Sequence, residues 1–192
     1  MPELIEFAFV ATTALTSATG AAGRGADTTV DPDLPVTGPT LKGLMRDAAR
    51  ELLGWEGASG ADVPLIREVF GWRRQPSPWH WSDLHPGSAT DVATRTRIRI
   101  DPATGTAARG ALLVAEEVSP LRGIVRVSQR GVVGADRHAL HVALLMVCGR
   151  LVHGLGSGRR RGKGWVDLTP LSPVLTAEDI ALVLAARGGG GS

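Results

Sequence analysis

Apolar residues recur along this chain with the periods of helices and strands, and the clearest period is helical. Residues 41, 44, 45, 48, 49, 52 and 53 fall on one side of a helix with about 3.6 residues per turn, which predicts an amphipathic helix. Pro39 suits its first turn and Gly54 suits its C-terminal end. A second helix is predicted over 138–152, where residues on nearly every side are apolar and therefore indicate burial.

Strand patterns occupy shorter runs at 4–13, 94–100, 111–118, 123–127 and 165–168. The run at 94–100 alternates strictly, so that Arg95, Arg97 and Arg99 share one face while threonines and isoleucines share the other. A turn over 101–105 joins it to the run at 111–118, which predicts a hairpin with one arginine face. A terminal helix is predicted over 176–186.

Two stretches between these elements lack a regular period. Residues 16–37 are small, polar and rich in glycine, and a loop of this length inside a domain is commonly functional. Residues 54–93 hold a short apolar segment and then an irregular stretch over 71–93, whose tryptophans either anchor a loop or stack on bases. We therefore expect one domain over 1–187 with an insertion at about 54–93, while 188–192 read as a flexible linker or a cloning scar.

Composition is that of an ordinary globular protein, and its most informative feature is the use of arginine. The 192 residues are 43% hydrophobic and 21% charged, which excludes disorder of the whole chain. Net charge is only +2, yet nearly all positive charge is carried by arginine, whose guanidinium groups bind phosphate through paired hydrogen bonds. The single cysteine, Cys148, excludes an internal disulfide, and no Cys/His spacing fits zinc. Because no signal peptide or membrane-spanning run is visible, we expect a cytoplasmic protein that does not bind membranes.

The strongest candidate for an anion-binding site is the stretch 153–166, which reads HGLGSGRRRGKGWV. Glycine lacks a Cβ and tolerates positive φ, so such a run admits a large anion to its backbone N–H groups while cations close around it. The P-loop pattern fails because Gly164 stands in place of the magnesium-binding hydroxyl, and the dinucleotide pattern fails because its third glycine is missing. A polymeric phosphate backbone therefore fits better than a mononucleotide, although a solvated basic loop gives the same pattern. The candidate ligands are Gly154, Gly156, Gly158, Arg159, Arg160, Arg161 and Lys163.

Lys42 and Arg46 form a second candidate site on the first predicted helix. They lie four residues apart, so they share one face near the helix N-terminus, where free backbone N–H groups already favour an anion. Cations in a first turn oppose the helix dipole, a small cost that bound phosphate would offset. The alternative is that both side chains only solvate the helix.

Three segments, taken in order, resemble the RAMP superfamily of CRISPR-associated proteins, and specifically the backbone subunits of type III effector complexes. They read LPVTGPTLKGLMR at 34–46, RIRIDPATGTA at 97–107 before the acidic pair Glu116 and Glu117, and the glycine-rich stretch described above. The resemblance covers roughly residues 4–168. It implies an α+β, ferredoxin-like (RRM-type) fold, in which an antiparallel sheet carries helices on one face and irregular insertions.

The resemblance also implies roles and partners. Lys42, Arg46 and the glycine-rich stretch would hold phosphates of a guide RNA (crRNA), along which other effector subunits and copies of this chain would stack. Target-cleaving members of the family carry an aspartate before the lysine–glycine block, and Asp27 occupies the similar place, with Asp31 and Asp33 as rivals. Asp27 would position Mg²⁺ or the attacking 2′-hydroxyl of a target RNA, and a metal is expected only if the chain is catalytic. The stretch from this aspartate to the lysine–glycine block is shorter than is usual in the family.

Two other functions fit the same sequence. A RAMP endoribonuclease that processes the guide precursor would use a histidine as general base, with His138 or His141 as candidates. A non-catalytic scaffold would bind a partner protein or a phosphorylated metabolite through the same loop. An Asp27 that only forms a turn would fit a role limited to binding.

Overall fold

Four strands form the central sheet of the structure, a computed structural model that describes residues 3–17, 25–56, 60–87, 90–119, 121–157 and 161–188. The strands are β1 (Leu4–Ala11), β4 (Trp79–Trp81), β7 (Leu121–Gln129) and β8 (Val166–Ser172). They pair in the order β4-β7-β1-β8, and every neighbouring pair is antiparallel. The predicted antiparallel core is confirmed.

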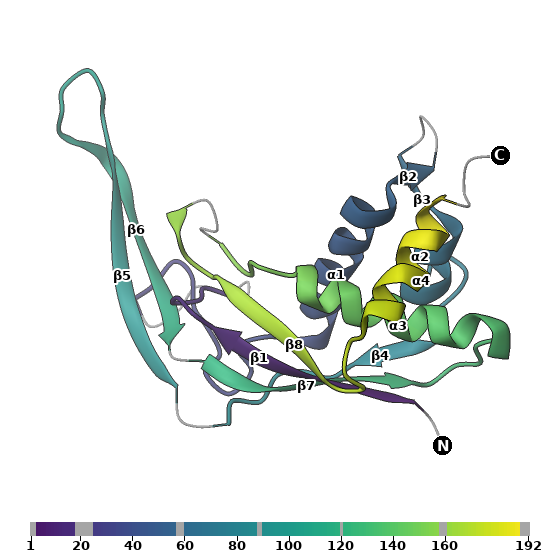
Figure 1. Cartoon of the computed structure of the whole chain (residues 1–192). Coiled ribbons are helices and arrows are strands. Elements are labelled where there is room, and N and C mark those ends of the chain that lie inside the picture. Colours follow the sequence, from purple (N-terminus) through teal and green to yellow (C-terminus); the bar gives the residue numbers. More distant parts are fainter. Residues whose placement is uncertain are drawn as a thin grey trace.

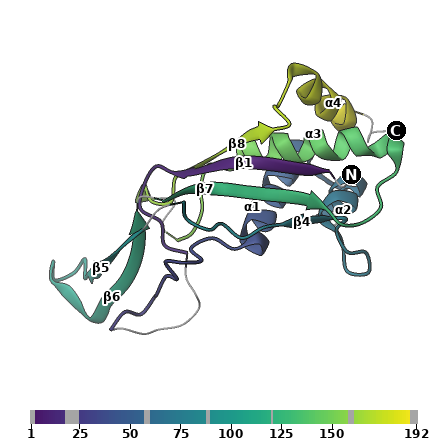
Figure 2. The same cartoon turned by 90° about the horizontal axis from the view of Figure 1, so that it is seen from below.

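Two long helices connect the strands and lie on the same face of the sheet (Figures 1 and 2). α1 (Gly38–Leu53) links β1 to β4, and α3 (Ala135–Leu151) links β7 to β8. The shorter α2 (Pro64–Phe70) packs against α1, and α4 (Ala177–Gly188) packs against α3. Two strand–helix–strand halves in one antiparallel sheet, with the helices on one face, form the ferredoxin-like fold that the resemblance implies. No helix in the described ranges is both long and apolar enough to cross a membrane.

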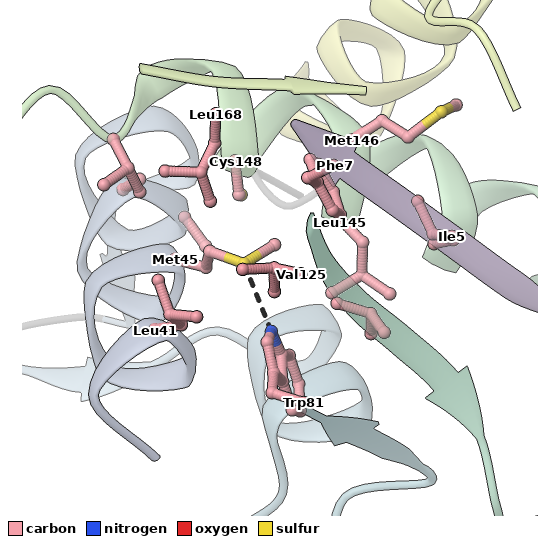
Figure 3. Packing of buried hydrophobic residues seen from close by; sticks show 14 of the residues in the cluster. Ile5, Phe7, Leu41, Met45, Trp81, Val125, Leu145, Met146, Cys148 and Leu168 are labelled. Carbon is pink, nitrogen blue, oxygen red and sulfur yellow. Dashed lines mark hydrogen bonds between the residues drawn. The ribbon is translucent and has the colours of Figure 1, made fainter. Parts of the chain in front are cut away.

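The core lies between the sheet and the two long helices. Ile5, Phe7 and Phe9 alternate along β1 and are fully buried, because only one face of the strand meets the helices. The predicted apolar stripe of α1 supplies Met45, whose sulfur accepts a hydrogen bond from the Trp81 indole N–H at 3.1 Å (Figure 3). Each fully buried side chain of this kind contributes about 1.5–3 kcal/mol.

α3 is buried on several sides, as its uniformly apolar sequence predicts. Leu144, Leu145 and Cys148 are among its fully buried residues. Burial raises the pKa of the Cys148 thiol well above its usual range, because a thiolate could not be solvated there. The chain's single cysteine is therefore held as an inert, apolar side chain.

A hairpin projects from the sheet as a separate ribbon, inserted between β4 and β7 (Figures 1 and 2). Arg95 and Arg97 share one of its faces, as the alternation predicts. The other face is also open to solvent, since Ile98 is 56% exposed. The hairpin consists of β5 (Asp91–Ile100) paired with β6 (Ala107–Ser119). A smaller ribbon after α1 consists of β2 (Trp55–Glu56) paired with β3 (Ala61–Asp62).

The structure differs from the prediction inside the expected insertion. The sequence predicts an irregular chain over 71–93, but β4 lies in this range and forms one edge of the central sheet. Trp79 and Trp81 point into the core while His80 is exposed, and three residues are too few for this alternation to be read from the sequence. Residues 18–24 of the predicted loop at 16–37, and the expected linker beyond residue 188, lie outside the described residues.

Two helical glycines test the packing of the core. A Cβ at Gly149 in α3 would overlap the ring of Phe7, whereas a Cβ at Gly43 in α1 would meet no atom within 4 Å. We expect Gly149→Ala to lower the free energy of unfolding by ~1–3 kcal/mol through overpacking, and Gly43→Ala to raise it by ~0.5–1 kcal/mol through helix propensity. Urea unfolding measures both values. Equal effects of the two substitutions would contradict the close approach of α3 to β1.

Candidate nucleic-acid interface

Three segments that carry candidate residues meet at one end of the sheet. Ala11, the last residue of β1, pairs with Leu121 at the start of β7 and with Val166 at the start of β8. The chain after β1, the β5–β6 hairpin before β7 and the segment before β8 therefore leave the sheet at the same end (Figure 1). We call the segment 153–165, which precedes β8, the glycine-rich loop.

The glycine-rich loop is folded back on itself and fastened to the chain after β1. Gly154 pairs with Trp165, and the Leu155 N–H donates to the Gly164 carbonyl oxygen at 2.8 Å. The Gly164 N–H in turn donates to the Ala14 carbonyl oxygen at 3.0 Å. Gly164 has a φ of 68°, and a Cβ there would collide with the Leu155 carbonyl oxygen. Only glycine fits this position.

Gly156 makes a second close approach. It has a φ of 81°, and a Cβ there would collide with the Thr16 carbonyl oxygen, which accepts a hydrogen bond from the Ser157 N–H at 3.1 Å. These glycines thus serve the packing of the chain itself, a use that the anion-binding pattern does not reveal. Among the other predicted ligands in the loop, Arg161 is exposed, while Gly158, Arg159 and Arg160 lie outside the described residues.

Lys163 is held by a buried carboxylate of the hairpin. Its ammonium donates a hydrogen bond to Glu117 on β6, whose side chain is 3% exposed. Arg97 donates to the same carboxylate at 3.3 Å, and the Arg95 guanidinium lies 3.8 Å from it. A buried carboxylate needs such partners, because an unpaired charge away from water is costly. Glu117 therefore fastens the glycine-rich loop to the root of the hairpin. In the sequence, the only sign of this contact is a carboxylate within an apolar strand.

Asp27 is fixed to the same strand of the hairpin. Its N–H donates to the Val114 carbonyl oxygen at 2.8 Å, and its carboxylate accepts a hydrogen bond from the Val114 N–H at 2.7 Å. Asp27 is nevertheless exposed. Asp31 instead accepts hydrogen bonds from the N–H groups of Asp33 and Leu34, which closes a local turn. The structure thus brings Asp27 to the strand that also holds the glycine-rich loop.

Lys42 and Arg46 lie on the flank of α1 that faces away from the glycine-rich loop. The flank toward the loop carries Leu44 and Ala48, which line a hollow together with His153. Positions 42 and 46 fall on nearly the opposite side of the helix from positions 44 and 48. The structure therefore divides the predicted phosphate ligands between two surfaces.

Arg46 is engaged in a largely buried ion pair. Asp62, which is 7% exposed, accepts hydrogen bonds from the Nε atoms of Arg46 at 2.9 Å and Arg50 at 2.6 Å. Burial acts to raise the pKa of Asp62, but the hydrogen bonds from Arg50 and Arg46 outweigh it and hold the pKa below its ordinary value. This network ties the β2–β3 ribbon to α1, so Arg46 has a structural partner before any ligand binds.

The two histidines considered as general bases lie at the opposite end of the sheet, in the first turns of α3. The Trp79 indole N–H donates to His141 Nδ1 at 3.2 Å, and His141 Nε2 lies 3.5 Å from the Glu68 carboxylate. Burial lowers the pKa of His141 against the opposing effect of Glu68. His138 Nε2 lies 3.2 Å from the side-chain oxygen of Gln129. Both rings are engaged in the fold, away from the glycine-rich loop.

A metal at Asp27 would need more ligands than the described side chains bring together there. Within the described ranges, no three His, Cys, Asp or Glu side chains lie together as a metal-ligand set. Mg²⁺ is commonly held by one or two carboxylates together with water and substrate phosphates, so a single carboxylate fits Mg²⁺ only in the presence of RNA.

These observations define a ferredoxin-like protein that carries a basic glycine-rich loop and an inserted hairpin at one end of its sheet. The family model of the RAMP superfamily matches residues 13–167, a range that includes the Asp27 segment, α1, the hairpin and the glycine-rich loop. The chain belongs to the RAMP superfamily, and with it to the CRISPR-associated RNA-binding proteins. No curated protein matches the sequence.

Two glycines of the loop test its closure. Gly162 and Gly164 both have positive φ, but only at Gly164 would a Cβ collide with the backbone. We expect Gly164→Ala to lower the free energy of unfolding by ~1–3 kcal/mol more than Gly162→Ala, because overpacking adds to a backbone strain that both variants share. Thermal unfolding measures this difference. Equal losses would show that the two arms of the loop do not approach each other as described.

Proposed function

We propose that this chain is a guide-RNA-binding backbone subunit of a type III CRISPR effector complex. Its partners are then the guide RNA (crRNA), the target RNA and other effector subunits, including copies of itself. The observation that carries the proposal is the meeting of the glycine-rich loop, the arginine-bearing hairpin and the Asp27 segment at one end of the sheet. Membership of the RAMP superfamily supports RNA as the ligand.

The basic residues of the glycine-rich loop supply the main phosphate contacts in this proposal. Arg159, Arg160 and Arg161 follow one another between two arms that backbone hydrogen bonds hold in place. Guanidinium groups bind phosphate oxygens through paired hydrogen bonds, and such contacts carry no base preference. Arg95 adds a cation that is 65% exposed on the nearby hairpin. Binding through phosphates suits a guide RNA, whose sequence differs from one complex to the next.

Asp27 supports a second part of the proposal, the cleavage of target RNA. Its carboxylate is exposed, and the hydrogen bond from the Val114 N–H restricts its position. In this role the carboxylate holds Mg²⁺ against RNA phosphate oxygens or orients the 2′-hydroxyl that attacks the neighbouring phosphorus. Bound Mg²⁺ would supply Lewis-acid stabilisation of the charge that develops on the phosphate.

The other two functions receive less support. A general base at His138 or His141 is disfavoured because both rings are hydrogen-bonded within the fold at the far end of the sheet. A scaffold that binds a partner protein or a phosphorylated metabolite would use the same glycine-rich loop, but membership of the RAMP superfamily favours RNA as the ligand of that loop.

Replacement of Arg159, Arg160 and Arg161 together with alanine tests guide binding. The slope of log K against log salt is negative, and loss of three phosphate contacts should make it less steep by about 0.7 per contact. Binding of single-stranded guide RNA should weaken at least about tenfold at moderate salt. Fluorescence anisotropy at several salt concentrations measures both quantities. The control combines Arg130→Ala with Arg187→Ala, two exposed arginines outside the loop, and should keep the unaltered slope. Unchanged slope and affinity in the triple variant would rule out the loop as the RNA site.

Asp27→Asn and Asp27→Ala separate a catalytic carboxylate from a structural one. The asparagine oxygen can still accept the hydrogen bond from the Val114 N–H but carries no charge. If Asp27 is catalytic, guide-loaded complexes with Mg²⁺ bind target RNA with either variant, and both cut it at least about 10²-fold more slowly.

The two substitutions give a different result if the role of Asp27 is structural. If Asp27 only fixes its segment to the hairpin, the asparagine variant cuts at the native rate and the alanine variant does not, which would overturn the catalytic role. Asp31→Asn and Asp33→Asn are matched controls that should cut at the native rate. If the unaltered complex does not cut at all, the chain only binds.

A further inference from the structure

A second group of cations lines a shallow pocket between α1 and the turn that follows α2. The pocket has a volume of about 430 Å³, and its lining includes Lys42, Arg46, Trp72 and Arg73. None of the described residues that line it carries a carboxylate. Because it lies on the flank of α1 that faces away from the glycine-rich loop, it is separate from the RNA surface proposed above.

Lys42 contributes a partly buried ammonium that has no acidic partner. Its Nζ lies 5.4 Å from the centre of the Trp81 ring, and within the described part of the chain no carboxylate forms an ion pair with it. Burial, and after it the charge of Arg46, lower the pKa of Lys42. A bound anion would offset both effects, because it would replace lost solvation and screen the neighbouring guanidinium.

The turn at 72–75 holds the opposite wall of the pocket in place. The Trp72 N–H donates to the Gln75 carbonyl oxygen at 2.7 Å, and the Gln75 N–H donates to the Trp72 carbonyl oxygen at 2.8 Å. Gly71 before it has a φ of 80°, and a Cβ there would lie 2.6 Å from the Ser77 backbone nitrogen. The turn is therefore seated closely against the chain that follows it, and Arg73 at its tip lines the pocket.

Trp72 adds an aromatic surface to this cationic pocket. The residue is 54% exposed, although tryptophan is usually buried to a large extent. The Arg67 guanidinium carbon lies 5.8 Å from the ring centre, which supports the ring through a cation–π contact. An exposed indole in the same pocket as the Lys42 ammonium suits a ligand that has both a flat π-system and an anionic group.

We propose that this pocket binds a nucleotide, with its phosphate between Lys42 and Arg73 and its base stacked on Trp72. Arg46 adds positive potential while it keeps its bonds to Asp62. The same chemistry is offered by a nucleotide within an RNA strand and by a free mononucleotide. The proposal does not depend on the type III assignment or on cleavage at Asp27.

Calorimetric titration of the full chain with 5′-AMP, adenosine and inorganic phosphate tests the proposal. AMP should bind more tightly than either fragment, because only AMP occupies both parts of the pocket. Lys42→Met and Arg73→Ala should each weaken AMP binding about tenfold, and Trp72→Ala should reduce the affinity for AMP to about that for inorganic phosphate. Arg74→Ala removes the same charge from the same turn without altering the pocket lining, so it should bind AMP as the unaltered chain does. Unfolding midpoints of all variants, measured alongside, exclude loss of the fold as the cause.

Titration with a single-stranded RNA of about six nucleotides distinguishes the two sources of the ligand. Weaker RNA binding by Arg73→Ala than by Arg74→Ala assigns the pocket to a nucleotide of a strand, and a loss for AMP alone assigns it to a free mononucleotide. The proposal is overturned if the two variants have equal affinities for AMP and for RNA, including the case in which neither ligand binds. The triple arginine variant of the glycine-rich loop should keep its AMP affinity, so failure of either proposal is recognised separately.

Discussion

The pairing of β1 with both of its neighbours is the constraint on which the rest of the structure depends. Because Ala11 pairs with Leu121 on one side and Val166 on the other, the starts of β7 and β8 lie about 4.8 Å from the end of β1. The hairpin and the glycine-rich loop directly precede those two strands and must leave the sheet there. A one-residue slip would turn Phe7 out of the core, so burial fixes the register. The layout of the candidate RNA surface thus follows from the hydrophobic alternation of one strand.

Buried carboxylates decide which of the many cations are open to a ligand. Asp62 binds two arginines of α1, and Glu117 binds Arg97 and Lys163. An unsatisfied buried acceptor costs about 1–3 kcal/mol, and more when it is charged, so these cations hold the fold together before they meet any ligand. The pocket beside Trp72 differs, because among the described residues no carboxylate lines it and Lys42 forms no ion pair there, although Arg46 in its lining is bound by Asp62. Some cations of this chain therefore stabilise the fold and others are open to a ligand, and the amino-acid composition does not distinguish the two groups.

The sequence predicts elements that repeat a period several times, and it misses contacts between distant segments. α1 and the hairpin follow from periodicity and α3 follows from a long apolar run, whereas β4 is too short to show either, and the fold class came from the family resemblance. The carboxylate partners of Arg46 and Lys163 lie 16 and 46 residues away along the chain, so no local pattern pairs them. The backbone partner of Asp27 is 87 residues away, and only the resemblance singles out this aspartate. Its catalytic role and the RNA contacts of the loop stay predictions.

The burial of Cys148 makes this chain well suited to site-specific labelling. A thiol in the core with a raised pKa offers no thiolate to maleimide reagents at neutral pH, and the chain has no other cysteine. A cysteine introduced at Thr104, in the exposed turn between β5 and β6, would be the single reactive site. A fluorophore or spin label attached there would report where the hairpin lies relative to RNA, while the buried Cys148 stays unlabelled.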